Sequence, residues 1–67
     1  MEAMNYKKHG YTHVLVEITN FEIKPIITKG FLNYKQMKKY QSEMSLEEIN
    51  SSIFKFMTIN QAIKKGY

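Results

Sequence analysis

A chain of 67 residues is long enough for one domain, and a folded domain of this size buries only about 60 % of the surface that its unfolded form exposes. It contains no cysteine, which excludes disulfide bonds, thiolate zinc sites and iron–sulfur clusters. The net charge is +4 at pH 7 and all ten basic residues are lysine, a usage that favours weak attraction to polyanions over the bidentate recognition of bases that arginine provides.

The N-terminal stretch MEAMNYKKHG is polar, and we expect residues 1–10 to be a flexible N-terminus that precedes a single domain over residues 11–67. This stretch lacks the apolar segment of a secretory signal. Elsewhere the uncharged apolar stretches are far shorter than the roughly 20 residues that a membrane-spanning helix needs. These features favour a cytoplasmic protein with no membrane partner.

From residue 12 onward the sequence alternates in the way that is typical of a half-buried strand, with Val14, Val16 and Ile18 on one face. After a turn at Thr19 and Asn20, the segment EIKPIITKG is again rich in strand-forming residues. Its proline has no N–H group, so the second strand should lie at the edge of the sheet, paired only with the first. We therefore predict a β-hairpin in the first half of the chain.

The segment that follows predicts a helix. Asn33 can cap a helix that begins at Tyr34, and apolar side chains recur along it at spacings of three, three and four residues, at Tyr34, Met37, Tyr40 and Met44. This apolar stripe would cover one face of the hairpin, which is only marginally stable without such a cover.

The segment SLEEINSSIFKFMTI, residues 45–59, permits two interpretations. In the first, it begins one long helix, because its apolar residues and those that follow fall within an arc of about 120°, namely Leu46, Ile49, Ile53, Phe56, Met57 and Ile63. Ser45 with Glu48 then forms a capping box, and Gly66 suits the left-handed position after the helix. These signals at both ends favour the long helix.

The second interpretation is a short helix, a strand and a final short helix. Phe54, Phe56 and Ile59 form strands more readily than helices, and Thr58 with Gln61 can cap a last helix. The predicted fold class is therefore α+β, with an N-terminal β-hairpin covered by two helices (ββαα). The alternative order is ββααβα, with a third strand at residues 52–59.

Residues that serve in metal binding or catalysis are sparse. On a strand His9 and His13 would lie roughly 13 Å apart, at about 3.3 Å per residue, too far to hold one ion. The sequence contains no aspartate, and its three glycines are isolated, so it has no glycine-rich phosphate loop. Glu47 and Glu48 lie at a predicted helix N-terminus, where carboxylates stabilise the helix. We expect a non-enzymatic protein without a metal or another cofactor.

The segment YKQMKKY is the densest cluster of basic and aromatic residues in the sequence. Its lysines can bind phosphate groups and its tyrosines can stack on bases, or the lysines can form a solvated face while the tyrosines are buried behind it. Lysines near both termini, namely Lys7, Lys8, Lys64 and Lys65, either extend a basic surface or simply confer solubility. The candidate macromolecule-binding residues are Tyr34, Lys35, Lys38, Lys39, Tyr40, Lys64 and Lys65.

The five tyrosines, four phenylalanines and five methionines exceed what two helices need to cover a hairpin. These residues can all serve as the core of a monomer. Such residues are also enriched at interfaces, so the alternative is an exposed apolar patch that binds a protein partner or a second copy of the chain. The free edge of the first strand offers another route to a homodimer or a partner, by strand addition.

These observations lead us to expect a small regulator or inhibitor that docks on a protein partner, of the kind that phages and mobile elements of AT-rich genomes encode. The alternative is a small basic protein that binds nucleic acid through lysine contacts to phosphate.

The predicted strand followed by two helices, the second beginning MSLEEINSSIF, loosely resembles the ribbon-helix-helix family of small dimeric DNA-binding repressors over roughly residues 21–65. The resemblance is one of pattern. It implies a dimer in which strands from two chains form a ribbon that places alternate polar residues in the major groove. A nucleic-acid-binding protein of this kind would be a transcriptional regulator.

Overall fold

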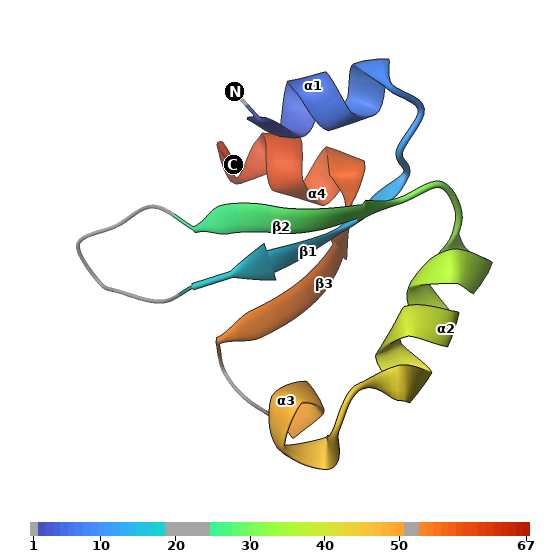
Figure 1. Ribbon diagram of the computed structural model, residues 1–67. Helices are drawn as coiled ribbons and strands as arrows, with labels where there is room; N and C mark the ends of the chain where they lie inside the picture. Colours follow the sequence, from blue (N-terminus) through green and yellow to red (C-terminus); the bar gives the residue numbers. More distant parts are fainter. Residues whose placement is uncertain (1, 19–24, 51–52) are drawn as a thin grey trace.

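A computed structural model of the chain describes residues 2–18, 25–50 and 53–67 (Figure 1). The fold is α+β, as predicted, and combines a three-stranded antiparallel sheet with short helices. In chain order the elements are α1 (Glu2–Lys8), β1 (His13–Glu17), β2 (Ile26–Phe31), α2 (Tyr34–Glu43), α3 (Leu46–Asn50), β3 (Phe54–Thr58) and α4 (Ile59–Lys64).

The strand order in the sheet is β2-β1-β3, and both pairs are antiparallel. The hairpin of β1 and β2 was predicted, and β2 lies at an edge, as Pro25 before it indicated. The turn predicted at Thr19 and Asn20 lies outside the described residues. The prediction that the edge of the first strand is free for a partner is wrong, because β1 is the central strand and has a neighbour on each side.

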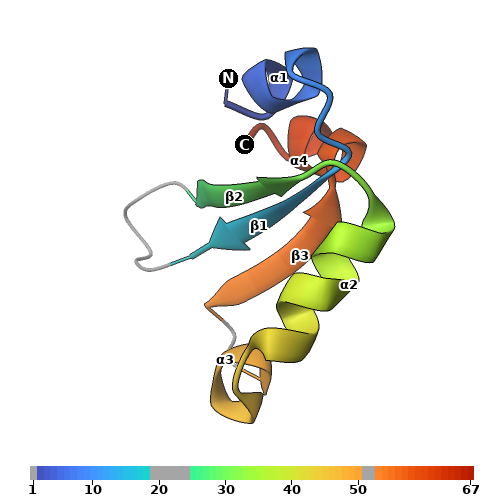
Figure 2. The same cartoon turned by 45° about the vertical axis from the view of Figure 1, so that its right-hand side comes forward.

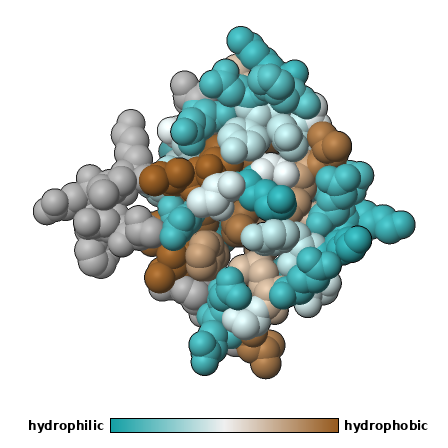
Figure 3. Space-filling view, in the orientation of Figure 1, coloured by the Kyte–Doolittle hydropathy of each residue, from teal (hydrophilic) through white to brown (hydrophobic). Residues whose placement is uncertain are grey.

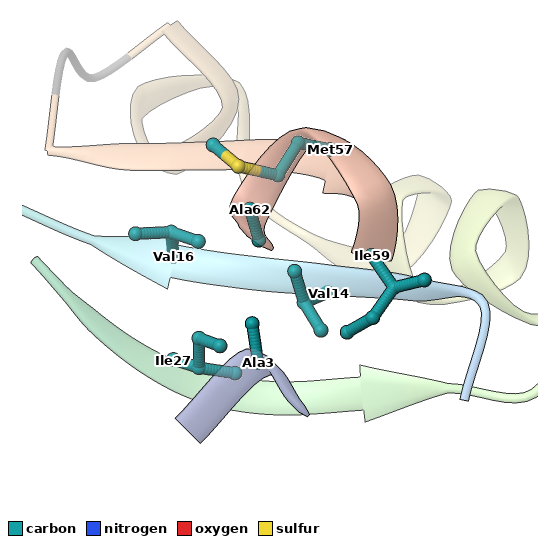
Figure 4. Close-up of a cluster of buried hydrophobic side chains, with 7 residues drawn as sticks. All are labelled: Ala3, Val14, Val16, Ile27, Met57, Ile59 and Ala62. Carbon is teal, nitrogen blue, oxygen red and sulfur yellow. The ribbon is translucent and has the colours of Figure 1, made fainter. Parts of the chain in front are cut away.

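Helices α1 and α4 lie side by side against one face of the sheet (Figures 1 and 2). Ala3 of α1 and Ala62 of α4 are fully buried there, and these small side chains let both helices approach the strands closely. The backbone N–H of Ala3 donates to the carbonyl of Tyr67 at 3.2 Å, which joins the two ends of the chain. Figure 4 shows the buried side chains of this first core, which are Ala3, Val14, Val16, Ile27, Met57, Ile59 and Ala62.

Helix α2 contacts the opposite face of the sheet and forms a second core. Leu15 of β1, Phe31 of β2 and Met37 of α2 are buried in it. The rings of Tyr40, Phe54 and Phe56 are partly buried against them. Because successive residues of a strand point to opposite faces, Val14 and Val16 serve the first core while Leu15 between them serves the second.

An irregularity in β2 distributes its side chains between the two cores. Val16 pairs with Ile27 and Leu15 pairs with Lys29, so Thr28 is an extra residue opposite this step of β1. The extra residue reverses the alternation. Ile27 therefore points into the first core and Phe31 into the second, although residues four apart on a regular strand would share a face.

The second half of the chain follows the alternative interpretation, and the predicted long helix from Leu46 to Ile63 is wrong. The predicted strand at residues 52–59 is observed as β3, Phe54–Thr58, while residues 51 and 52 lie outside the described ranges. Leu46 is 76 % exposed, so the apolar arc does not mark a core-facing stripe. The side chains of β3 enter both cores, which explains why neither of its faces looks polar in the sequence.

Side-chain caps determine where the helices begin. The Asn33 side chain accepts a bond from the N–H of Gln36 at 2.8 Å, as predicted. The predicted capping box of Ser45 and Glu48 is also present, with the N–H of Glu48 donating to Oγ of Ser45 at 3.2 Å. At the end of β3, Thr58 and Gln61 form a reciprocal capping box. This second box turns the chain from strand into helix.

The N-terminus differs from the expected flexible segment over residues 1–10, because α1 occupies Glu2–Lys8. The helix ends in a Schellman motif, in which the N–H of Tyr11 donates to the carbonyl of Tyr6 and that of Gly10 to Lys7. Gly10 has a φ of 87°, a conformation that glycine adopts without strain. The tilted contact of the Tyr6 and Tyr11 rings, with centroids 5.3 Å apart, completes the motif.

None of the helices in the described ranges has both the length and the apolar character that a bilayer span requires.

Candidate macromolecule-binding surface

Tyr34 at the start of α2 is 57 % exposed, so the interpretation that buries it behind the lysines is wrong. The ammonium group of Lys38 lies 5.9 Å from the centre of its ring. The His13 ring, on β1, contacts the ring of Tyr34 with centroids 5.7 Å apart. Tyr34 and Lys38 thus form an exposed cation–π pair in the N-terminal half of α2, and the Tyr34 ring also contacts β1.

Tyr40 is in a different environment. Its ring contacts those of Phe31 and Phe56, at centroid distances of 5.4 and 6.5 Å. The ammonium group of Lys29, on β2, lies 5.3 Å from the centre of the Tyr40 ring. Tyr40 therefore belongs mainly to the second core, and Lys29 bridges from β2 to α2 beside it.

An open hollow of about 330 Å³ lies between β2 and α2. We call it the β2–α2 groove. Two lysines and one glutamate give its walls a positive balance of charge. The residues that line it are Lys29, Gly30, Phe31, Gln36, Lys39, Tyr40 and Glu43.

One wall of the groove is the outer strand β2, whose backbone geometry can be worked out from the ladder. On either side of β1, the N–H of Ile18 donates to Ile53 and the carbonyl of Thr12 accepts from Ile59, so in the same register the even-numbered residues Val14 and Val16 bond to β3. On the β2 side, the carbonyl of Phe31 accepts from the N–H of Thr12. The odd-numbered residues then bond to β2, and Val14 with Gly30 is a pair without mutual hydrogen bonds. The N–H and C=O of Gly30 consequently point away from β1, toward the free edge.

Two exposed apolar side chains stand at the ends of this edge. Ile26 begins β2 and is 46 % exposed, and Leu32 directly follows β2 and is 50 % exposed. In Figure 3 hydrophilic residues cover α2, on the right, while hydrophobic surface appears over the strands, left of centre. Sequence reasoning missed Ile26, Lys29 and Leu32 as candidates, because their common edge depends on the sheet order.

The candidate lysines do not form one continuous surface. Lys35, Lys38 and Lys39 are exposed on α2, against one face of the sheet. Lys64 and Lys65 are exposed at the end of α4, which packs against the other face. Two separate basic regions therefore exist, and the predicted extension of one by the other is wrong.

The two histidines each have a different hydrogen-bond partner close in the sequence. Nδ1 of His9 lies 2.8 Å from the Asn5 carbonyl oxygen, and Nδ1 of His13 lies 2.8 Å from the Thr12 hydroxyl. Within residues 2–18, 25–50 and 53–67, no three histidine, aspartate or glutamate side chains come together in a way that could hold a metal ion.

No protein-family model, curated protein or solved structure matches this chain. The arrangement implied by the ribbon-helix-helix resemblance is absent from the described fold. Strand β2, which would form the intermolecular ribbon, pairs with β1 of the same chain, and β3 interrupts the second helix.

Proposed function

We propose that the chain is a small protein-binding module that regulates or inhibits one partner protein by docking on it through the β2–α2 groove and the apolar side chains beside it. The observation that carries the proposal is the position of Ile26 and Leu32 at the two ends of an open strand edge. Side chains along an open strand edge can anchor a segment that adds to that edge.

The groove supplies both components of a protein interface. Apolar contact would come from Ile26, Leu32 and the edge of the Tyr40 ring, and polar contact from Lys29 and Lys39. Apolar anchors within a polar rim are the usual anatomy of interfaces between proteins. Docking would also cover apolar surface that a chain of 67 residues leaves in water.

The test compares two exposed leucines. Leu32→Ser removes an anchor at the groove, and Leu46→Ser makes the same change on α3, where the leucine is 76 % exposed. The tagged chain and both variants serve as baits in extract of the native host, and the dominant protein recovered is then purified and titrated against each. We expect one-to-one binding that Leu32→Ser weakens by about tenfold or more, because anchors dominate interface energy, and that Leu46→Ser leaves unchanged. Equal effects of the two variants, or no binding between purified components, would refute the proposal.

A second candidate function is binding of nucleic acid, which the exposed pair of Tyr34 and Lys38 favours. A base can stack on an exposed aromatic ring while neighbouring lysines neutralise phosphates. Lys35 and Lys39 stand on the same helix. This candidate predicts that the chain binds any nucleic-acid duplex, with an affinity that falls steeply with salt.

A further inference from the structure

We infer that the β2–α2 groove receives an extended acidic segment of the partner protein, which adds to the free edge of β2 as a fourth strand. This inference rests on the proposed function, since it specifies which part of a partner docks and by which contacts. Three features of the groove lead to it, namely the backbone of β2, the charges on the α2 side and the rings on the α1 side.

The backbone of β2 is available for pairing at Gly30. Its N–H and C=O point outward, and within the described residues no side chain or other strand bonds to them. Glycine brings no side chain that would hold a second backbone away, and glycine within a strand often marks such an approach. A six-residue strand such as β2 spans about 17 Å at 3.3 Å per residue, so a segment of similar length would run from Ile26 to Leu32.

On the α2 side, the groove favours acidic side chains in the docked segment. Lys29 and Lys39 line it together with the single carboxylate of Glu43, and the chain as a whole carries +4. Every second side chain of an added strand would face α2. Acidic residues at those positions would lie among the two lysines, and basic residues there would be repelled.

On the face of β2 that α1 covers, the surroundings favour apolar side chains in an added strand. The rings of Tyr6 and Tyr11 lie against Gly30 on the face that α1 covers. They also line a second hollow, of about 220 Å³, with Asn5 and His9. The alternate side chains of an added strand would face these rings. The expected segment therefore alternates acidic with apolar residues over about six positions.

The charge of the groove argues against a second copy of the chain as its occupant, and the backbone of β2 argues against a nucleic acid. A second copy of the chain carries the same +4 charge and would bring its own Lys29 and Lys39 to the interface. A nucleic acid has no repeating pattern of donors and acceptors that matches both the N–H and the C=O of a strand edge. Both occupants are outcomes that the experiment below can return.

The experiment selects binders from a displayed library of random seven-residue peptides, with the whole chain as bait. We expect acidic and apolar residues to alternate among the selected peptides and proline to be rare. The best peptide is synthesised in three forms, namely unchanged, with lysine in place of each acidic residue, and with proline at the centre. Amide chemical shifts of the chain then report where each form binds. The unchanged peptide should perturb Gly30 and its neighbours in β2, and the other two forms should bind at least about tenfold more weakly.

A charge reversal in the groove provides the matched comparison. Lys29→Glu with Lys39→Glu should reverse the preference, so that the lysine form binds better than the acidic one. Lys35→Glu with Lys38→Glu makes the same change in net charge on α2 outside the groove and should leave the preference intact. Thermal unfolding of both double variants shows that they remain folded.

Selected peptides without acidic residues, an unchanged preference after the groove reversal, or shifts that avoid β2 would each overturn the inference. Self-association of the chain through β2, or occupation of the groove by an oligonucleotide, would overturn it as well. The proposed function has a separate criterion. If the recovered partner protein binds and depends on Leu32 but not on Lys29 and Lys39, the inference fails while the proposed function stands.

Discussion

The ring of Tyr6 in α1 lies so close over Gly30 in β2 that a Cβ atom at position 30 would stand 2.6 Å from Cδ1 of that ring. Tyr11 approaches the same point to 2.8 Å. The absence of a side chain at Gly30 thus allows α1 to lie on the sheet. It also leaves the neighbouring strand edge open, so one residue links the packing of the N-terminal helix to the proposed binding site.

Gly30→Ala should lower the free energy of unfolding by about 1–3 kcal/mol, the usual result of placing an extra carbon in a packed site. Urea denaturation measures the change. Combining the substitution with Tyr6→Ala removes one of the two clashing rings, so Gly30→Ala should then have a smaller effect, with the Tyr11 ring accounting for the remainder. Equal effects in the two backgrounds would show that Tyr6 does not lie over Gly30.

Ala3→Leu tests whether α1 is a packed part of the domain. Ala3 is fully buried between α1, α4 and the sheet, so a larger side chain should destabilise the fold by about 1–3 kcal/mol. Asn5→Leu enlarges an exposed residue of the same helix and should change the stability by less than about 0.5 kcal/mol. A flexible N-terminus would make both substitutions neutral.

Thr58→Ala tests the junction between β3 and α4. The Thr58 hydroxyl accepts from the N–H of Gln61 at 3.2 Å, and the Gln61 side chain accepts from the N–H of Thr58 at 3.0 Å. Losing the hydroxyl should reduce the free energy of unfolding by about 0.5–2 kcal/mol. Thr58→Ser keeps a hydroxyl that can cap the helix, so it should retain most of the stability that Thr58→Ala loses. In a continuous helix Thr58 would have no capping role, and alanine there would stabilise the chain.

The nucleic-acid alternative makes its own prediction. If it holds, the chain binds any DNA duplex with an affinity that falls steeply with salt. Replacing Lys35, Lys38 and Lys39 together with glutamine then reduces the salt slope by about 2–3, because each lysine that neutralises a phosphate accounts for close to one unit of the slope. Lys64→Gln with Lys65→Gln removes charge from the other face and serves as the comparison. Under the protein-docking proposal, no duplex binding appears at about 150 mM salt.

Local signals in the sequence predict several parts of the fold well. The caps at Asn33 and Ser45 depend on residues three positions away, so sequence alone can identify them. Gly66, with a φ of 81°, is in the predicted left-handed position after α4. Helix α1 also has a local signal, since Gly10 follows Lys7, Lys8 and His9 and stands between Tyr6 and Tyr11, the two positions whose side chains meet in a Schellman motif.

Other features depend on contacts between distant segments. Met57 of β3 is buried in the first core, while Phe54 and Phe56 are partly buried in the second, and these contacts, rather than an alternating pattern, stabilise the segment as a strand. The candidate site could be predicted from the sequence only in part. The sequence pointed to α2, but the groove also needs Lys29, Gly30 and Phe31 of β2 beside that helix, and no spacing along the chain indicates this proximity.

The central claim, that a partner docks on the free edge of β2, is tested most directly by hydrogen exchange of the Gly30 amide, measured by NMR with and without the recovered partner protein. In the free chain this amide points outward and should exchange faster than those of Leu15 and Lys29 in the ladder. Strand addition predicts that binding slows the exchange of Gly30 by about tenfold or more. Unchanged exchange at Gly30 when the chain is saturated with its partner would contradict the claim.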